Sequence, residues 1–339
     1  MRGKLQRLLL GLSVALLLAE LGLRLTGRLE TYSESNFGVY RSVLGSTKPT
    51  WLHLRNPSKS EQYTTADFAF ALDTNREGVR DVEHAEANPQ GLWRVVALGD
   101  SYTEGVGAAF ADSWPQRLAE RLQTRGLPVE LLQAGVAGSD PFFSFALLEQ
   151  ELLPYRPRLV LFLLNATDLC DTLWWGGTER FLPDGTTRAR PAPWFEPLYR
   201  VSHLVRLVVH QSYDWRMVRK ATAAAANRDA EARIVELLER AQALGRREGF
   251  AIWVGVHPTP DEVHSRTRPF SESFFGELRA RGIPAADLSP GMEAALGELA
   301  LTDYSWPVDR HYNARGYAVL AELVERELGA AGLLPSTPR

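Results

Sequence analysis

The sequence predicts an α/β protein in which a parallel sheet carries helices on both faces. Two observations support this fold class. From residue 93 onward, short apolar runs of strand length alternate with segments of helical periodicity. The run at 158–164, RLVLFLL, is apolar after its first residue, as expected of a central parallel strand that is buried on both faces.

Each expected element has its own signal. Strands are expected at residues 95–98, 129–132, 158–164, 251–256 and 283–288. Helices are expected to begin after Asp112-Ser113 and Asp140-Pro141, and to lie at 198–218, 230–244, 270–280 and 317–328. This alternation supplies the helical crossovers that neighbouring parallel strands require.

Composition divides the chain into four segments. Residues 1–29 are strongly apolar, and residues 30–92 contain many loop-forming residues, which predicts a loop-rich extension with an edge strand or a hairpin. The α/β domain is expected at 93–330, followed by a tail at 331–339. Within the domain, residues 169–228 break the strand–helix rhythm and are expected to form an insertion.

The N-terminal segment combines positive charge with an apolar helix. Arg2, Lys4 and Arg7 precede an uncharged run at 8–19, and a helix over 5–25 would be about 30 Å long, enough to span a bilayer. The basic residues predict a single-pass signal anchor in the cell membrane with an exported domain, periplasmic or extracellular. The alternatives are a cleaved signal peptide, which would give a secreted protein, and a soluble amphipathic helix.

Composition also limits the class of function. The chain has 45% hydrophobic residues and nine tryptophans, which indicates a globular protein. A net charge of −3 gives no general attraction for nucleic acid, so no such partner is expected. Cys170 is the only cysteine, so there is no internal disulfide. The histidines lack zinc-site spacing, and we expect no metal and no cofactor.

The stretch RVVALGDSYTEGVG at 94–107 indicates where the chemistry lies. An apolar run stops at a Gly-Asp-Ser tripeptide, which places Ser101 at the carboxyl end of a strand, where open α/β sheets bind ligands. Thr103 replaces the second glycine of a hydrolase nucleophile elbow. The stretch also lacks the lysine of a phosphate loop and the third glycine of a dinucleotide fingerprint. Ser101 is therefore a candidate nucleophile.

A serine nucleophile needs a base and a residue that orients the base. Near the C-terminus, WPVDRHYNARG places Asp309 and His311 directly before a helix that Asn313 can cap. The carboxylate of Asp309 can fix the tautomer of His311, and the imidazole can then take the proton of Ser101. Taken alone, this pattern is weak evidence, because a surface or core histidine is the commoner case.

Four stretches, in order, resemble the motifs of the SGNH/GDSL hydrolases: ALGDSYTEGVG, QAGVAGSD, PRLVLFLLNATDL and VDRHYNARGYAVLAELV. The resemblance covers about residues 93–330 and is closest to a membrane-anchored bacterial subgroup. It implies a flavodoxin-like three-layer α/β/α sandwich. It also implies hydrolysis of acyl esters on a lipid, a sugar or a small molecule through an acyl-enzyme, without a metal or a cofactor.

The resemblance further implies the donors of an oxyanion hole. Ser101 matches the nucleophile, whose own N–H points into the hole, and Gly138 matches the glycine that supplies a second N–H. The third motif departs from the family, because NATD places Thr167 where the asparagine donor is expected and Asn165 where a glycine is expected. Either Thr167 or Asn165 is expected to take the place of that donor, or neither does.

The remaining candidates lie at the strand ends. Asp309 and His311 match the family's terminal acid and base. Trp174 and Trp175 follow the third motif and either line an acyl or sugar subsite or pack in the core. His257 follows the strand at 251–256 and either packs or binds substrate.

The sequence thus predicts an exported, membrane-tethered serine esterase acting on an acyl ester. Two other hypotheses use the same fold. An O-acetyltransferase or deacetylase acting on envelope polysaccharide would use the same residues to move an acyl group. A non-catalytic envelope protein would keep the fold, a hypothesis that the substitution at the third motif leaves open.

Overall fold

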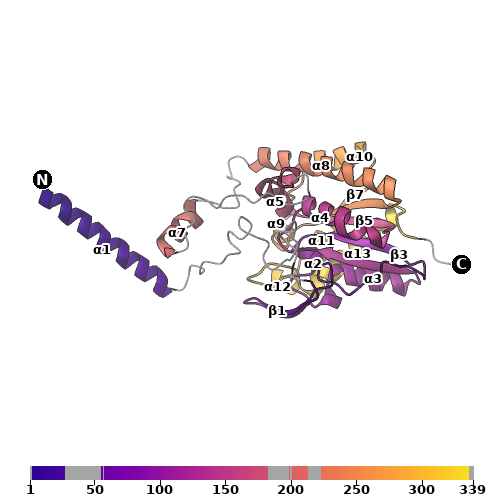
Figure 1. Ribbon diagram of the computed structural model, residues 1–339, viewed down its shortest axis with the longest axis horizontal. Coiled ribbons are helices and arrows are strands. Elements are labelled where there is room, and N and C mark those ends of the chain that lie inside the picture. Colours follow the sequence, from indigo (N-terminus) through magenta and orange to yellow (C-terminus); the bar gives the residue numbers. More distant parts are fainter. Residues whose placement is uncertain are drawn as a thin grey trace.

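The computed structural model describes residues 2–26, 55, 57–181, 198, 201–212 and 223–335. Most of the predicted extension before residue 57, three stretches of the predicted insertion and the end of the tail lie outside the described residues. Figure 1 shows a body built around one sheet, with the helices α1 and α7 set apart from it.

A five-stranded parallel sheet forms the centre of the body. Its strands are β3 (Trp93–Gly99), β4 (Val129–Gly135), β5 (Leu159–Leu164), β6 (Ala251–Val256) and β7 (Ala285–Asp287). They lie in the order β4-β3-β5-β6-β7 and pair in parallel throughout. This is the flavodoxin-like order, and the chain reverses its direction of winding between β3 and β5. Ligands bind at such a switch point, beyond the carboxyl ends of the strands.

Helices cover both faces of this sheet, which confirms the predicted three-layer α/β/α fold. One face packs against α4 (Pro141–Leu147), α5 (Ala166–Trp175), α8 (Ala223–Glu248) and α10 (Glu272–Ala280). The other packs against α3 (Trp114–Thr124), α11 (Ser289–Leu296) and α13 (Ala314–Ala330). Shorter helices are α2 (Ser101–Glu104), α9 (Pro260–Ser265) and α12 (Leu301–Tyr304), with single turns η3 (Phe110–Asp112) and η6 (Gly177–Arg180).

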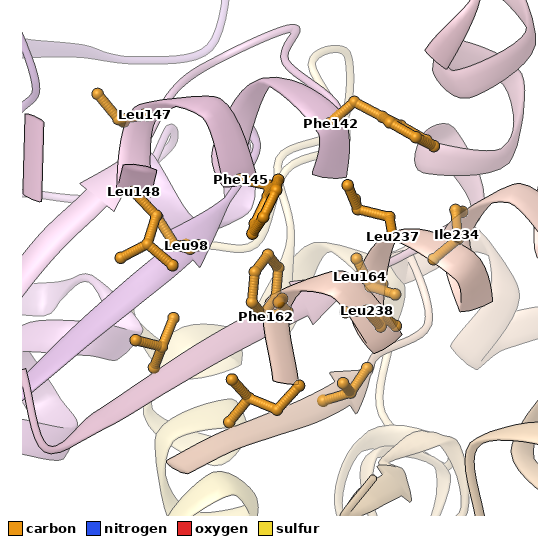
Figure 2. Close-up of a cluster of buried hydrophobic side chains, with 14 of the residues drawn as sticks. Leu98, Phe142, Phe145, Leu147, Leu148, Phe162, Leu164, Ile234, Leu237 and Leu238 are labelled. Carbon is orange, nitrogen blue, oxygen red and sulfur yellow. The ribbon is translucent and has the colours of Figure 1, made fainter. Parts of the chain in front are cut away.

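Alternating side chains along the central strands fill two cores. In β5, Phe162 and Leu164 belong to the core under α4 and α8, whereas Leu163 belongs to the core under α3 and α13. Figure 2 shows Phe145 of α4 and Leu237 of α8 directed at this strand. The uniformly apolar pattern of β5 therefore follows from burial on both faces.

Three element boundaries differ from the prediction, and two of them have an identifiable reason. The helix that begins at Pro141 leaves α geometry at η4 (Leu148–Leu152) and η5 (Leu153–Tyr155), because Pro154 lacks the N–H that an α-helix needs. α8 begins seven residues earlier than expected, since the alanines at 223–226 favour a helix without apolar periodicity. β7 has only three residues.

The described part of the N-terminal extension packs on the body. Its strands β1 (Ser60–Thr64) and β2 (Ala69–Asp73) form an antiparallel hairpin, as predicted, but this hairpin is a separate sheet and not an edge of the main one. The buried Arg80 donates hydrogen bonds to the carbonyls of Glu104 and Gly105 at 3.1 and 2.8 Å, and to that of Ala108 at 3.0 Å. The extension is thus bound directly to the end of α2.

Two helices lie apart from the body. α1 (Arg2–Thr26) contains the one segment among the described residues, Gly3–Thr26, that is long and apolar enough to cross a membrane, a test that a signal sequence also passes. α7 (His203–Ser212) contacts α1, and the predicted helix at 198–218 falls partly outside the described residues. In α1, the carboxylate of Glu20 accepts hydrogen bonds from the N–H groups of His203 and Leu204, both at 2.9 Å.

Candidate active site

Ser101 is the first residue of α2 and lies directly beyond the end of β3. Asp100 caps this helix, accepting a hydrogen bond from the Tyr102 N–H at 2.9 Å. The helix approaches the neighbouring strand closely: a Cβ on Gly135 of β4 would lie 2.2 Å from the backbone nitrogen of Glu104. Only glycine permits this approach, so the local sequence holds the Ser101 hydroxyl at the carboxyl edge of the sheet.

Ser101, His311 and Asp309 form one hydrogen-bonded chain. The Nε2 atom of His311 lies 2.8 Å from the Ser101 Oγ, and its Nδ1 atom lies 2.5 Å from the Asp309 Oδ1. An Nδ1–H that donates to the carboxylate leaves the lone pair of Nε2 free to accept the serine proton. The fold therefore brings together three side chains that were selected from motifs about 200 residues apart.

The ionisation of Asp309 suits this arrangement. Partial burial acts to raise the pKa of Asp309, but hydrogen bonds from His311 and the charge of its ring outweigh burial and lower that pKa below the usual aspartate value. The His311 ring lies beside the Tyr102 ring, with 4.8 Å between centroids. The Asp309 carboxylate thus stays charged, and the His311 imidazole contacts this carboxylate and the Tyr102 ring.

A short loop carries the acid and the base. The Trp306 N–H donates to the His311 carbonyl at 3.0 Å, and the Trp306 Nε1–H donates to the Gly107 carbonyl at 2.7 Å. Arg310, between the two functional residues, has the left-handed φ of 70°. The loop ends at Asn313, which caps α13 as the sequence predicts.

Two backbone N–H groups at this edge are available to a ligand. Among the described residues, none accepts a hydrogen bond from the N–H of Ser101 or of Gly138. Gly138 is exposed, has φ +74°, and has open space where a Cβ would lie. The adjacent Ala137 N–H donates to the buried carboxylate of Glu104 at 3.1 Å, which holds this loop beside α2.

Asn165 and Thr167 both turn toward Asp100. The Asn165 Nδ2 donates to the Asp100 Oδ2 at 2.9 Å, and the Thr167 Oγ1 lies 3.0 Å from the same oxygen. The Asn165 Oδ1 accepts a hydrogen bond from the Thr167 N–H at 2.9 Å, which caps α5. Asn165 is fully buried, whereas Thr167 is exposed. Of the two candidate donors, only Thr167 therefore has a side chain that is accessible to solvent.

The other candidates are placed differently. His257 follows β6, is fully buried, and contacts the Tyr102 ring with 4.7 Å between centroids. Its Nδ1 lies 2.8 Å from the Pro258 carbonyl oxygen, and burial lowers its pKa. In this structure His257 packs and offers no surface to a substrate. Trp174 and Trp175 end α5, but their side chains lie outside the described residues.

Sequence reasoning missed two carboxylates that contact the site. Glu104 holds the loop before Gly138, and Asp67 of the hairpin accepts hydrogen bonds from the N–H groups of Val308 and Asp309 at 2.8 and 2.7 Å. Both contacts join distant segments, so no local spacing signals them. In the part of the chain that the structure describes, no group of three or more His, Cys, Asp or Glu could hold a metal ion.

Residues 97–319, about two thirds of the chain, match the GDSL-like Lipase/Acylhydrolase family. The chain belongs to this family. It is accordingly a carboxylic ester hydrolase. A comparison with curated proteins gives no match.

Solved structures with a similar arrangement include three esterases or hydrolases. An α/β hydrolase from the metagenome of Lake Arreo, Spain, is 16% identical with a TM-score of 0.45, over 72% of this chain and 96% of that one. An acetylxylan esterase from Geobacillus stearothermophilus is 14% identical with a TM-score of 0.44, over 70% and 94%. A two-domain esterase active on acetylated mannans is 14% identical with a TM-score of 0.43 over 73% of this chain, which spans about half of that protein (52%).

The lowered pKa of Asp309 predicts a specific pH dependence of stability. The charged carboxylate stabilises the folded state above the pKa of the unfolded chain, about 4, and this contribution is lost as the pH falls through the lower folded pKa. The wild type and Asp309→Asn should therefore differ most in unfolding free energy at neutral pH. Denaturant unfolding should show the gap closing below about pH 4, and a gap independent of pH would contradict the pairing.

Proposed function

We propose that Ser101 is the nucleophile of ester hydrolysis, His311 the general base and Asp309 the residue that orients it. The hydrogen-bonded chain from Asp309 through His311 to Ser101, at 2.5 and 2.8 Å, is the observation that carries this proposal. Its position at the switch point between β3 and β5 supports it, because ligands of open α/β sheets bind there.

The proposed reaction has two halves. The His311 Nε2 takes the proton of Ser101 while the Oγ forms a bond to the ester carbonyl carbon. The tetrahedral intermediate collapses to an acyl-enzyme, and the leaving alcohol takes the proton from His311. A water molecule, deprotonated by His311, then attacks the acyl carbon. The carboxylic acid leaves, and the proton returns to the Ser101 oxygen.

The N–H groups of Ser101 and Gly138 are the proposed donors to the oxyanion. Neither has an acceptor among the residues that the structure describes, and both lie at the same sheet edge. Such donors stabilise charge that develops only in the transition state. The exposed Thr167 hydroxyl is proposed as the third donor, in place of the family's asparagine. In the structure its single proton faces the Asp100 Oδ2 at 3.0 Å or the Asn165 Oδ1 at 2.9 Å, so the proposal requires the hydroxyl to rotate toward the oxyanion.

We also propose that α1 is retained as a membrane anchor. The Glu20 carboxylate of this helix accepts hydrogen bonds from the Ser202 hydroxyl and from two N–H groups at the start of α7. Arg24, also in α1, donates to the Val201 carbonyl at 2.5 Å. A cleaved leader would leave the N-terminus of α7 without these partners. The contact therefore favours an uncleaved anchor over a signal peptide.

Covalent labelling with a fluorophosphonate tests the nucleophile. Wild type should react at Ser101, Ser101→Ala should not react, and His311→Ala should react at least about 10³-fold more slowly, because the serine loses its base. Ser273→Ala, an exposed serine on α10, is the matched control and should label like wild type. Equal labelling of all four proteins would contradict the assignment.

The same preparations separate the alternatives by activity. Aryl esters of short and long acyl chains, with and without an acceptor glycan, distinguish hydrolysis from acyl transfer. We expect release of free acid without an acceptor. Acylation of the glycan instead would identify a transferase. If none of the esters were hydrolysed, the result would favour a non-catalytic protein.

Removing the Thr167 hydroxyl tests the third donor. Thr167→Val keeps the shape of the side chain, and kcat should fall about 10²-fold with little change in KM, since the hydroxyl acts on the transition state. Thr167→Asn restores an amide at the position where the family carries one and should keep or raise kcat. A wild-type kcat in Thr167→Val would show that two backbone donors suffice.

The anchor is tested in the full-length chain. The protein should stay with the membrane at its unprocessed mass of 37.8 kDa. In Glu20→Ala, α7 should become more sensitive to limited proteolysis, because its first N–H groups lose their acceptor. The control Glu61→Ala, at an exposed glutamate of β1, should leave that sensitivity unchanged. A shorter, soluble product in the wild type would instead show cleavage.

A further inference from the structure

Asp67 joins the N-terminal hairpin to the loop that carries the acid. It lies in the turn between β1 and β2, and its Oδ2 accepts the N–H groups of Val308 and Asp309 at 2.8 and 2.7 Å. Among the described residues, no other hydrogen bond joins the backbone of those two positions to another segment. One carboxylate oxygen therefore fixes the backbone from which the Asp309 side chain extends.

The loop that carries Asp309 and His311, called the acid loop below, has few internal hydrogen bonds near Val308 and Asp309. Its internal backbone-to-backbone hydrogen bonds link Trp306 with His311 and with Arg310, at the two ends of the loop. The Asp309 side chain contacts only His311 within the loop, accepting from its N–H at 3.3 Å and lying 2.5 Å from its Nδ1. The left-handed conformation of Arg310 is costly for a residue with a side chain, so surrounding contacts must maintain it. Two N–H groups bound to one carboxylate supply such a contact on the Asp309 side.

Local hydrogen bonds and an aromatic contact hold the turn that carries Asp67. The Thr65 hydroxyl accepts the N–H groups of Asp67 and Phe68, both at 3.2 Å, which fixes the turn. The Phe68 ring packs on Trp306 with 5.2 Å between centroids, so the turn and the loop also meet through apolar contact.

The same segment holds the nucleophile helix. Arg55 donates to the Glu104 carboxylate at 2.6 Å, and Arg80 donates to three carbonyls at the end of α2. The Arg80 guanidinium lies 4.1 Å from the centroid of the Phe70 ring in β2, which couples the helix contact to the hairpin. The extension thus contacts both the nucleophile side and the acid side of the site.

We propose that Asp67 is a positioning residue for Asp309 and that the turn between β1 and β2 supports the esterase site. This proposal rests on the proposed roles of Ser101, His311 and Asp309. Asp67 acts through the backbone of Asp309: it holds the carboxylate in line with the His311 Nδ1–H, and the imidazole in line with Ser101. Its charge is not required for this, because an amide oxygen can accept the same two N–H groups.

The test compares Asp67→Ala with Asp67→Asn in the full-length protein. Asp67→Ala should lower kcat about 10- to 100-fold with little change in KM, since misalignment by a fraction of an ångström impairs proton transfer but not substrate binding. Asp67→Asn should keep most of the activity. Asp73→Ala, at an exposed aspartate on the same hairpin, is the matched control and should equal wild type.

A spectroscopic measurement reports alignment without any substrate. The low-field proton resonance of the His311 Nδ1–H should be present in wild type and Asp67→Asn, and lost or broadened by exchange in Asp67→Ala. A merely structural role would lower the unfolding midpoint of Asp67→Ala without changing kcat or this resonance at temperatures where the variant is folded. Should Asp67→Ala fail to fold, Asp67→Glu, which displaces the acceptor by one methylene, should give an intermediate loss of kcat.

The two proposals fail in different ways. Wild-type kcat and an unchanged resonance in Asp67→Ala, with Ser101→Ala inactive, would overturn the positioning role and leave the nucleophile assignment intact. Hydrolysis that survives in Ser101→Ala would overturn the proposed function itself.

Discussion

The close approach of α2 to the ends of two paired strands is the constraint on which the site depends. Gly99 and Gly135 face each other in the register of β3 and β4, and a Cβ on either would lie 2.2 to 2.3 Å from an atom of Thr103 or Glu104. Because neither glycine has a side chain, the helix begins directly at the sheet edge. The Ser101 hydroxyl and N–H are thereby fixed together, which a nucleophile and an oxyanion donor on one residue require.

Three carboxylates then hold the other segments of the site in place around this helix. Asp100 accepts hydrogen bonds from Asn165 and Thr167 at the end of β5, Glu104 accepts the Ala137 N–H beyond the end of β4, and Asp67 accepts the backbone of the acid loop. Asp100 and Glu104 are buried, and a buried carboxylate is tolerated only with hydrogen-bond donors or a cation beside it. Each carboxylate thus needs its partner segment in place, so the loops of the site are held by the same contacts that satisfy these charges.

Those features of the fold and the site that depend on local residue patterns and on the order of motifs could be predicted from the sequence. The five strands and the choice of Ser101, Asp309 and His311 rest on apolar runs and on motifs, and the structure brings these three side chains within hydrogen-bonding distance. The direction of the Asn165 side chain could not be predicted from the sequence, because it depends on a hydrogen bond to the buried Asp100, 65 positions away. The contact between Asp67 and the Asp309 backbone could not be predicted either, since it spans 242 positions and the turn that contains Asp67 has no catalytic motif.

The proposed anchor also explains why a glutamate is tolerated in an apolar helix. A charge inside the hydrocarbon region is costly, and residues 3–19 of α1 give about 26 Å of helix before Glu20, close to the thickness of that region. Glu20 would therefore lie at the exported interface, where the start of α7 satisfies its carboxylate. Val201 and Val208, beside and within α7, are exposed in the structure. With the proposed anchor in place, an amphipathic helix capped at that depth would lie along the bilayer surface, which would bring the insertion that begins at α5 back to the membrane.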